Sequence, residues 1–354
     1  ISLTIMKKEI AIGTIRIQAK GLIPYEKTKT SWKKSSKQFS NIKEIIKLFK
    51  AHQNFDVLVD KKNPKFLKGQ LSPQNQVQGA RINILPDGTK IDKAYSLFAK
   101  ELTVHDQSSD EHWDVLYQNP GGTWSYCYTL EKKAKNTIKK YKKVDRFDKV
   151  YLKLIKNVSL ALKNKKDNLA LPMYTLLRTR MRIGNEIYYK LHNHKGLTTL
   201  KKKNIKIKGN EIQFKYVGKD GVPQDIKKKF PEQYVKRIKK HLSSLKANDF
   251  VFVSNSGKPL PEKDFKIAFK RYCGQEFYPH IVRSHYATTK VKNFIKGKKK
   301  LNKTEINKLY LEIAASLGHK KFDKKDHLWK ESSSVTVGHY IEPKLVEKVK
   351  RMIK

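Results

Sequence analysis

The first third of the chain alternates short apolar segments with polar ones. Strands are predicted near its start by the isoleucines Ile10, Ile12, Ile15 and Ile17. A helix with Ser40 as its N-cap is predicted by the spacing of Ile42, Ile45, Ile46 and Phe49. Prolines and the Gly121-Gly122 pair then break the apolar pieces, up to a strand over 124–128 with one face formed by Trp124, Tyr126 and Tyr128. We therefore expect a small, mainly β N-terminal domain over residues 1–133.

Helical spacing dominates the remainder of the chain. A lysine-rich stretch over 132–143 marks the boundary, and amphipathic helices are predicted over 147–158 and 169–182. Residues 205–216 alternate around a Gly209-Asn210 turn, which predicts a β-hairpin. Further helices are predicted around 234–245, 265–272, 306–315 and 344–353. These elements predict an α+β protein whose second domain, residues 134–354, is mainly helical and contains the hairpin.

The net charge of the chain indicates the class of partner that it binds. The chain has 354 residues, with 78 Lys and Arg against 32 Asp and Glu, a formal net charge of +46. A polyanion such as DNA or RNA would screen this self-repulsion, and release of its counterions would drive binding. On charge alone, a basic ribosomal or chromatin-type protein without chemistry fits equally well.

Cysteine and hydropathy exclude other classes. Cys127 and Cys273 stand in separate regions, which argues against a disulfide framework or a cysteine zinc site, and the lone His192-x-His194 pair is a weak metal signal. No apolar run reaches the length of a membrane span, and no signal peptide is evident. We expect a protein of the cytoplasm or nucleoid, or of a nucleus or virion if viral, that is not secreted. Met6 is a candidate for the native start of the chain, with residues 1–5 outside it.

Five sequence segments resemble motifs of one family of DNA-binding enzymes. Residues 182–188, RIGNEIY, and 196–200, GLTTL, resemble the RxGNExY and GLTTL signature of type IB DNA topoisomerases, in their poxvirus-like and bacterial branch. Residues 212–220 resemble the strand and loop that carry the family's catalytic lysine. The remaining three motifs of the family follow in the same order at residues 280–284, 317–319 and 334–340. The resemblance covers roughly residues 120 to 354.

This resemblance implies a set of catalytic residues. Arg182 and Arg283 would bind the non-bridging phosphate oxygens, because a guanidinium is a permanent bidentate donor to phosphate. Lys219, at the tip of a hairpin, would protonate the leaving 5′-oxygen, and His319 would donate a hydrogen bond to a non-bridging oxygen. Tyr340 would attack the phosphate and form a 3′-phosphotyrosine. Tyr286 and Tyr310 are rival nucleophiles, but both precede His319, contrary to the family's order.

The resemblance also implies contacts with DNA. Tyr126 and Tyr128 match paired tyrosines of the family's N-terminal domain that contact bases, although a buried β-face explains them as well. We also expect Tyr188, Lys203 and His280 to bind DNA. His280 stands where poxvirus-like enzymes carry a lysine, and the interval from His319 to Tyr340 is longer than theirs.

The expected function is ATP- and metal-independent relaxation of positive and negative supercoils. The resemblance implies a monomer that forms a clamp around duplex DNA, with no cofactor, metal or membrane partner. A tyrosine site-specific recombinase or integrase is the alternative that the spacing His280-x-x-Arg283 favours, whereas the segments 182–186 and 196–200 speak against it. A DNA-compacting factor without enzymatic activity is the alternative from another class.

Overall fold

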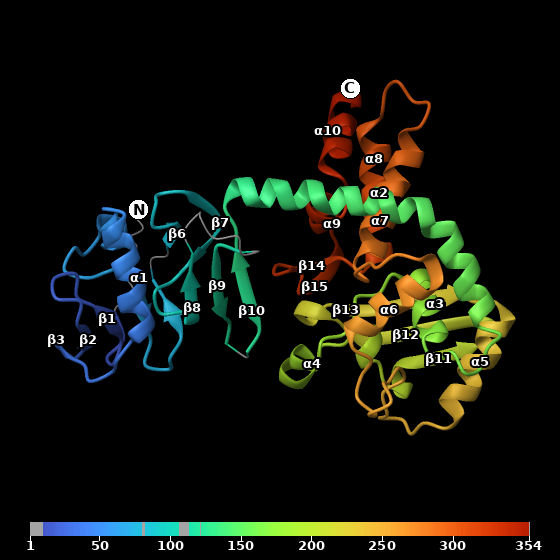
Figure 1. Ribbon diagram of the computed structural model, residues 1–354, viewed down its shortest axis with the longest axis horizontal. Helices are drawn as coiled ribbons and strands as arrows, with labels where there is room; N and C mark the ends of the chain where they lie inside the picture. The colour runs from blue at the N-terminus through green and yellow to red at the C-terminus, as the bar shows by residue number, and fades with distance from the viewer. Residues whose placement is uncertain (1–9, 80–81, 106–112, 121, 354) are drawn as a thin grey trace. The chain divides into compact units, whose positions relative to one another are not determined.

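The structure is a computed structural model that describes residues 10–79, 82–105, 113–120 and 122–353, except the side chains of Ser40, Ile187 and Tyr188. The chain divides into two compact units, Ile1–Ile138 and Lys139–Lys354 (Figure 1). The division falls inside one helix, α2 (Leu130–Ala161). The predicted domain boundary, between residues 133 and 134, lies in the same helix.

The first unit is built mainly of short antiparallel strands. Its largest sheet has the order β3-β2-β1-β4-β5, formed by β1 (Ile15–Ile17), β2 (Pro24–Lys27), β3 (Trp32–Lys34), β4 (Gln70–Leu71) and β5 (Val77–Gln78). A second sheet has the order β10-β9-β8, and β6 pairs with β7. These strands are β6 (Ile82–Ile84), β7 (Lys90–Tyr95), β8 (Lys100–Val104), β9 (Val115–Gln118) and β10 (Trp124–Cys127). The 3₁₀ turn η1 (Phe55–Leu58) and helix α1 (Ser40–Ala51), whose buried residues are Ile42, Ile45, Ile46 and Phe49, complete this unit.

Two predicted boundaries in this unit are wrong. Only Ile15 and Ile17 of the four isoleucines lie in a strand, whereas Ile12 is 57% exposed. Helix α1 includes Ser40, so that its N-cap is Phe39, without a side-chain capping bond. Such one-residue differences are common because helix ends fray and their assignment depends on cap geometry.

Strand β10 presents two aromatic side chains to solvent. Trp124 is 44% exposed and Tyr126 is 38% exposed, whereas the next residue, Cys127, is fully buried in the core. Tyr128 follows the strand and is half-buried, with its backbone N–H donating to Asp92 Oδ1. The predicted common face is therefore exposed at Trp124 and Tyr126, which contradicts a buried β-face there.

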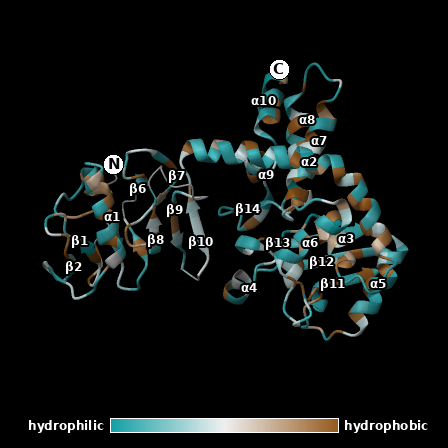
Figure 2. Cartoon of the chain, in the orientation of Figure 1, coloured by the Kyte–Doolittle hydropathy of each residue, from teal (hydrophilic) through white to brown (hydrophobic). Residues whose placement is uncertain are grey.

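Helix α2 runs without interruption through the lysine-rich stretch that the sequence suggested as a boundary. Lysine is a good helix former, so a high lysine content does not interrupt the helix. Its buried residues recur at three- to seven-residue intervals and are Tyr141, Val144, Phe147, Leu154 and Val158. Polar and apolar residues are accordingly interspersed along the helix (Figure 2).

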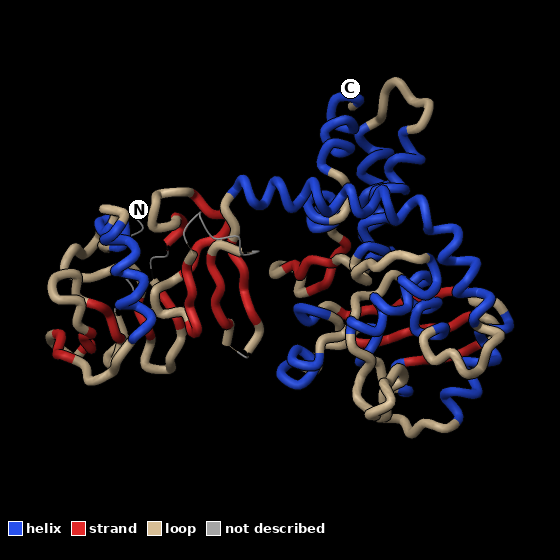
Figure 3. The backbone as a smooth tube through the Cα atoms, in the orientation of Figure 1, coloured by secondary structure: helices blue, strands red, loops and turns tan. Residues whose placement is uncertain are grey.

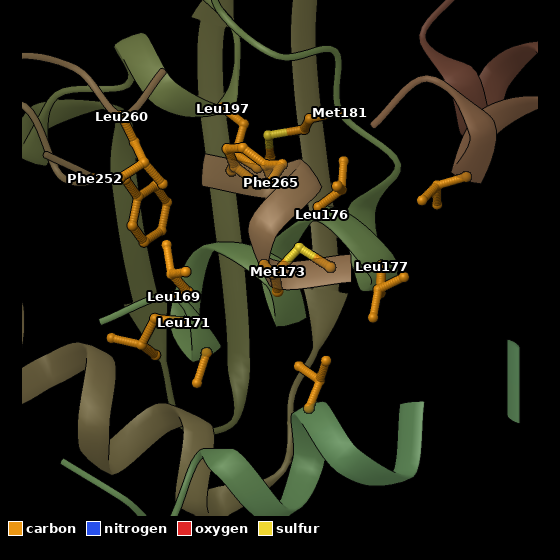
Figure 4. Packing of buried hydrophobic residues seen from close by; sticks show 14 of the residues in the cluster. Leu169, Leu171, Met173, Leu176, Leu177, Met181, Leu197, Phe252, Leu260 and Phe265 are labelled. Carbon is orange, nitrogen blue, oxygen red and sulfur yellow. The ribbon is translucent and has the colours of Figure 1, made fainter. Parts of the chain in front are cut away.

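The second unit contains a three-stranded antiparallel sheet with helices around it (Figure 3). The predicted hairpin is confirmed: β11 (Ile205–Lys208) pairs with β12 (Glu211–Val217). A third strand that the sequence did not reveal, β13 (Pro223–Lys229), pairs with β12 and contains the lysines 227–229. The surrounding helices are α3 (Ala170–Thr179), α4 (Glu186–His192), α5 (Glu232–Ser243) and α6 (Glu262–Cys273). Figure 4 shows part of the core of this unit, which contains Met173 and Leu176 of α3, Phe265 of α6, and Leu197.

The C-terminal part of this unit forms a separate hydrophobic cluster. It is composed of α7 (Ile281–Ile295), α8 (Lys303–Leu317), α9 (Ser334–His339) and α10 (Pro343–Met352). The polar stretch before α9 is a β-hairpin, β14 (Lys320–Asp323) and β15 (Leu328–Glu331). Among the described residues, no helix combines the length and the hydropathy needed to cross a bilayer.

Candidate active site

Arg182 is held by close contact between the two most specific sequence segments. Helix α3 ends at Thr179 and not at Arg182, because Arg180 adopts a left-handed conformation with φ of 58°. Arg182 then accepts a hydrogen bond from Leu197 N through its carbonyl oxygen (2.8 Å). A Cβ atom on Gly196 would lie 2.6 Å from both Arg182 O and Gly184 N, so that only glycine permits this approach. The glycines of RIGNE and GLTTL thus fix the backbone that carries Arg182.

Arg283 lies in the first turn of α7 and is 2% exposed. Its guanidinium donates to the carbonyl oxygens of Arg180 (2.6 Å) and Leu317 (2.9 Å) and to Nε2 of His319 (2.9 Å). Its Nε atom has no hydrogen-bond partner within the described part of the chain. Burial lowers the pKa of Arg283, and the neighbouring Tyr340 phenol opposes that shift. A guanidinium starts so far above neutrality that it remains charged.

His319 follows the end of α8 and is neutral in this arrangement. Gly318, with φ of 68°, terminates the helix. Since an arginine can only donate, Nε2 of His319 must accept from Arg283, and the ring proton must reside on Nδ1. Nδ1 donates to Thr336 Oγ1 at 2.7 Å. Burial, with Arg283 and Arg182 close by, lowers the pKa of His319 to about 3.

Several of the predicted site residues lie around the ring of Tyr340. It lies directly after α9, is 2% exposed, and its N–H donates to Thr336 O (2.9 Å). The centroid of its ring lies 4.8 Å from the ring of His319 and 4.9 Å from the ring of His280. The guanidinium carbons of Arg283 and Arg182 lie 5.0 Å and 5.9 Å from the same ring. Two permanent cations therefore lie close to the Tyr340 ring.

The rival tyrosines occupy different surroundings. Tyr286 stacks beneath Arg180, whose guanidinium carbon lies 3.7 Å from its ring, and its hydroxyl donates to Ser316. The buried hydroxyl of Tyr310 has no hydrogen-bond partner among the described residues.

Lys219 stands at the tip between β12 and β13, in the turn η4 (Lys219–Gly221), and is exposed. It lines one cavity together with Arg182, Arg283 and His319. His280 lines an adjoining cavity with Arg182, Lys219 and Arg283. His280 is exposed at the surface, but the atoms packed around its ring, together with Arg283 and Arg182, lower its pKa to about 3.

The predicted DNA contacts lie on several elements and stay predictions. Lys203 is exposed in the turn η3 (Lys202–Asn204), which follows the turn η2 (Leu197–Thr199) along the chain. Tyr188 belongs to α4, but its side chain lies outside the described residues. Tyr126 and Tyr128 belong to the first unit.

Sequence reasoning missed three residues at this site. Thr336, fully buried, binds His319, while Lys140 and Tyr141 of α2 bind the backbone on either side of Tyr340. Thr336 lies within a segment that was matched to the family, but its hydroxyl had no assigned role. Lys140 and Tyr141 gave no signal, because about 200 residues separate them from their partners.

Comparison with known proteins defines the class. Residues 129–341 match the family described as eukaryotic DNA topoisomerase I, catalytic core. The match covers more than half of the chain, and the chain belongs to this family. The match does not assign the chain to a branch of this family. No curated protein matches the sequence.

Solved structures of a DNA recombinase also resemble this chain in part. They are the XerH site-specific recombinase bound to difH substrate in a pre-cleavage complex, and the same recombinase bound to palindromic difH in a post-cleavage complex. The TM-scores are 0.32 and 0.33, each at 16% sequence identity. Each similarity covers 47% of this chain and 44% of the recombinase chain, less than half of either protein.

Proposed function

We propose that this protein is a type IB DNA topoisomerase, of the poxvirus-like and bacterial branch, that relaxes supercoils of either sign. The single observation that carries the proposal is the surroundings of the Tyr340 ring, which has Arg182, Arg283 and His319 within contact distance. Membership of the topoisomerase I family supports an isomerase that acts on DNA.

The proposed cleavage step is a transesterification. The Tyr340 phenol releases its proton to water as its oxygen attacks the scissile phosphorus, the new P–O bond forms a 3′-phosphotyrosine, and the bond to the 5′-oxygen breaks. Lys219 supplies the proton that the leaving 5′-oxygen takes up. Arg182 and Arg283 stabilise the charge on the non-bridging oxygens. Religation reverses these steps, and because the ester retains the bond energy it needs no ATP.

His319 would act as a hydrogen-bond donor only after a rearrangement. In the structure its Nε2 accepts from Arg283. When Arg283 turns to a phosphate oxygen, the His319 proton can move to Nε2, because the Thr336 hydroxyl can donate to Nδ1 as readily as it accepts from it. His319 then donates to the phosphate without becoming charged.

The proposed partner is duplex DNA, bound by a monomer as a clamp. A net charge of +46 and the exposed Trp124 and Tyr126 of β10 support this partner. The N-terminal domain, predicted over residues 1–133, would close on the duplex, and the nicked strand would rotate before religation.

The decisive experiment is relaxation of negatively and positively supercoiled plasmid in EDTA without ATP. We expect wild-type protein to relax both signs, Tyr340→Phe to relax neither, and the matched control Tyr310→Phe to retain activity. An active Tyr340→Phe variant would show that the nucleophile lies elsewhere. A wild-type protein that binds DNA tightly without relaxing it would favour a recombinase or a compacting factor.

Tyrosine recombination is the second candidate, favoured by the His280 ring against Tyr340 and three residues before Arg283. A recombinase would cleave with the same chemistry but would need a synaptic tetramer. Gel filtration with DNA carrying paired sites separates the two, because the proposed topoisomerase elutes as a one-to-one complex.

A further inference from the structure

Two adjacent side chains of α2 donate hydrogen bonds to the backbone on both sides of Tyr340. Lys140 Nζ donates to the carbonyl oxygen of His339 at 2.5 Å. Tyr141 Oη donates to the carbonyl oxygen of Ile341 at 2.7 Å. We call Lys140 and Tyr141 the α2 clip.

The clip adds to the backbone hydrogen bonds of this part of the chain, in which the N–H groups of Tyr340 and Ile341 donate to Thr336 O. Residues 340–342 join α9 to α10, and the last carbonyls of a helix have no partner within that helix. The carbonyl of Tyr340 itself accepts from Thr288 Oγ1 of α7 at 3.3 Å. Side chains from α2 and α7 therefore satisfy three consecutive carbonyl oxygens, at residues 339, 340 and 341.

The clip residues are built into the site. Tyr141 is 6% exposed and takes part in the core of the second unit. The Lys140 ammonium is half-buried and lies 5.7 Å from the centroid of the Tyr340 ring. Burial lowers the pKa of Lys140 to about 8, as expected for an ammonium that has lost part of its hydration.

We propose that Lys140 and Tyr141 are positioning residues that hold the Tyr340 oxygen in line with the scissile phosphate. This inference rests on the proposed function, because it assumes that Tyr340 is the nucleophile. Each clip bond restrains the peptide group next to Tyr340, so loss of one lets the ring leave its place among Arg182, Arg283 and His319. Since a misplacement of about 1 Å can cost about 100-fold in rate, the clip controls cleavage without touching DNA.

Conservative variants test the clip. Tyr141→Phe removes only the hydroxyl, and Tyr310→Phe is its control, because the latter removes a buried hydroxyl without a hydrogen bond to the described residues. Lys140→Met removes the ammonium, and Lys139→Met removes the same charge from an exposed neighbour on the same helix. Lys140→Arg retains a charged donor of similar reach.

The measurement is the single-turnover rate of covalent adduct formation on supercoiled plasmid, with enzyme in excess and the adduct trapped in SDS. We expect Tyr141→Phe and Lys140→Met to form the adduct about 10- to 100-fold more slowly than their controls, with a DNA Kd within about twofold of those controls. Lys140→Arg should recover part of the rate. A merely structural role would lower the melting temperature without this separation of rate from binding.

The outcomes distinguish the inference from the function on which it rests. If both clip variants form the adduct as fast as their controls while Tyr340→Phe forms none, the clip does not position the nucleophile, although the topoisomerase mechanism stands. If the wild-type protein forms no adduct, or Tyr340→Phe still forms one, the proposed function fails and the clip has no role.

Discussion

The Nε2 atom of His319 lies 2.9 Å from Nη2 of Arg283, and only the arginine can donate in this pair. The two residues that we propose to contact the phosphate are therefore bonded to one another. In the proposed mechanism, a phosphate that binds both side chains replaces this hydrogen bond. Thr336 remains bonded to the imidazole at Nδ1, on the side opposite Arg283.

Thr336→Val should slow cleavage without weakening DNA binding. The substitution retains the shape of a fully buried side chain but removes the hydroxyl that can either accept from or donate to His319 Nδ1. Loss of one oriented donor costs about 10- to 100-fold in rate when the imidazole loses its supported tautomer. Thr336→Ser, which keeps the hydroxyl, is the control. Equal cleavage rates for the valine and serine variants would exclude this role.

The neutral state of His319 makes the protein sensitive to acid. Its pKa in the folded protein is about 3, against an ordinary value of 6.5, so the unfolded chain takes up the proton first as the pH falls. The contribution to stability is fully present above pH 6.5 and is lost as the pH falls toward 3, with a slope of about 1.4 kcal/mol per pH unit. Between pH 6 and pH 4, His319→Gln should reduce the pH dependence of the unfolding free energy by about 1.4 kcal/mol per pH unit. The measurement is the unfolding free energy of both proteins across this pH range, and an unchanged slope in His319→Gln would contradict the prediction.

Arg283→Lys should reduce cleavage by about 100-fold or more, although the charge is retained. A lysine has no planar fork and cannot reach Arg180 O, Leu317 O and His319 Nε2 from one head group. Removal of one transition-state donor typically costs about 10²–10³ in rate. The measurement is single-turnover adduct formation at saturating protein. A lysine variant with wild-type rate would mean that Arg283 contributes only its charge.

Gly196→Ala should disable the site through the backbone. The added Cβ would meet Arg182 O and Gly184 N at 2.6 Å, and no side-chain rotation can relieve a clash with backbone atoms. We expect cleavage to fall by about 100-fold as Arg182 is displaced. Gly338→Ala is the control, because its Cβ would have no heavy atom within 4 Å. Were both variants to cleave alike, the contact between the two segments would not position Arg182.

Local patterns predicted the parts of the fold that depend on neighbouring residues. The hairpin around Gly209-Asn210 is confirmed because strand alternation and turn chemistry lie within a dozen residues. Helix α7 was missed because part of its buried face is polar: Arg283, Ser284, His285 and Thr288 are all buried. A hydrophobic period does not reveal such a helix.

Contacts between residues that lie far apart in the chain could not be predicted from the sequence. The motifs gathered the candidate residues Arg182, Arg283, His319 and Tyr340, which the structure places around one ring. They could not indicate that Arg180 would turn left-handed and end α3 early, or that α2 would reach the chain near Tyr340. Both depend on tertiary packing that no local propensity encodes.

The role of Lys219 can be separated from general electrostatic help by changing the leaving group. Lys219 is exposed on the turn between β12 and β13 and lines the cavity of the two arginines, where it could reach the 5′-oxygen. If it is the general acid, Lys219→Ala should slow cleavage by about 10²–10⁴-fold on normal DNA. With sulfur in place of the bridging 5′-oxygen, the leaving thiolate needs no proton, because a thiol has a pKa of about 8.5. The alanine variant should then cleave nearly as fast as wild type, whereas Arg283→Lys should remain slow on both substrates, since its defect lies in the charge of the transition state. Equal slowing of Lys219→Ala on both substrates would instead assign Lys219 to phosphate binding.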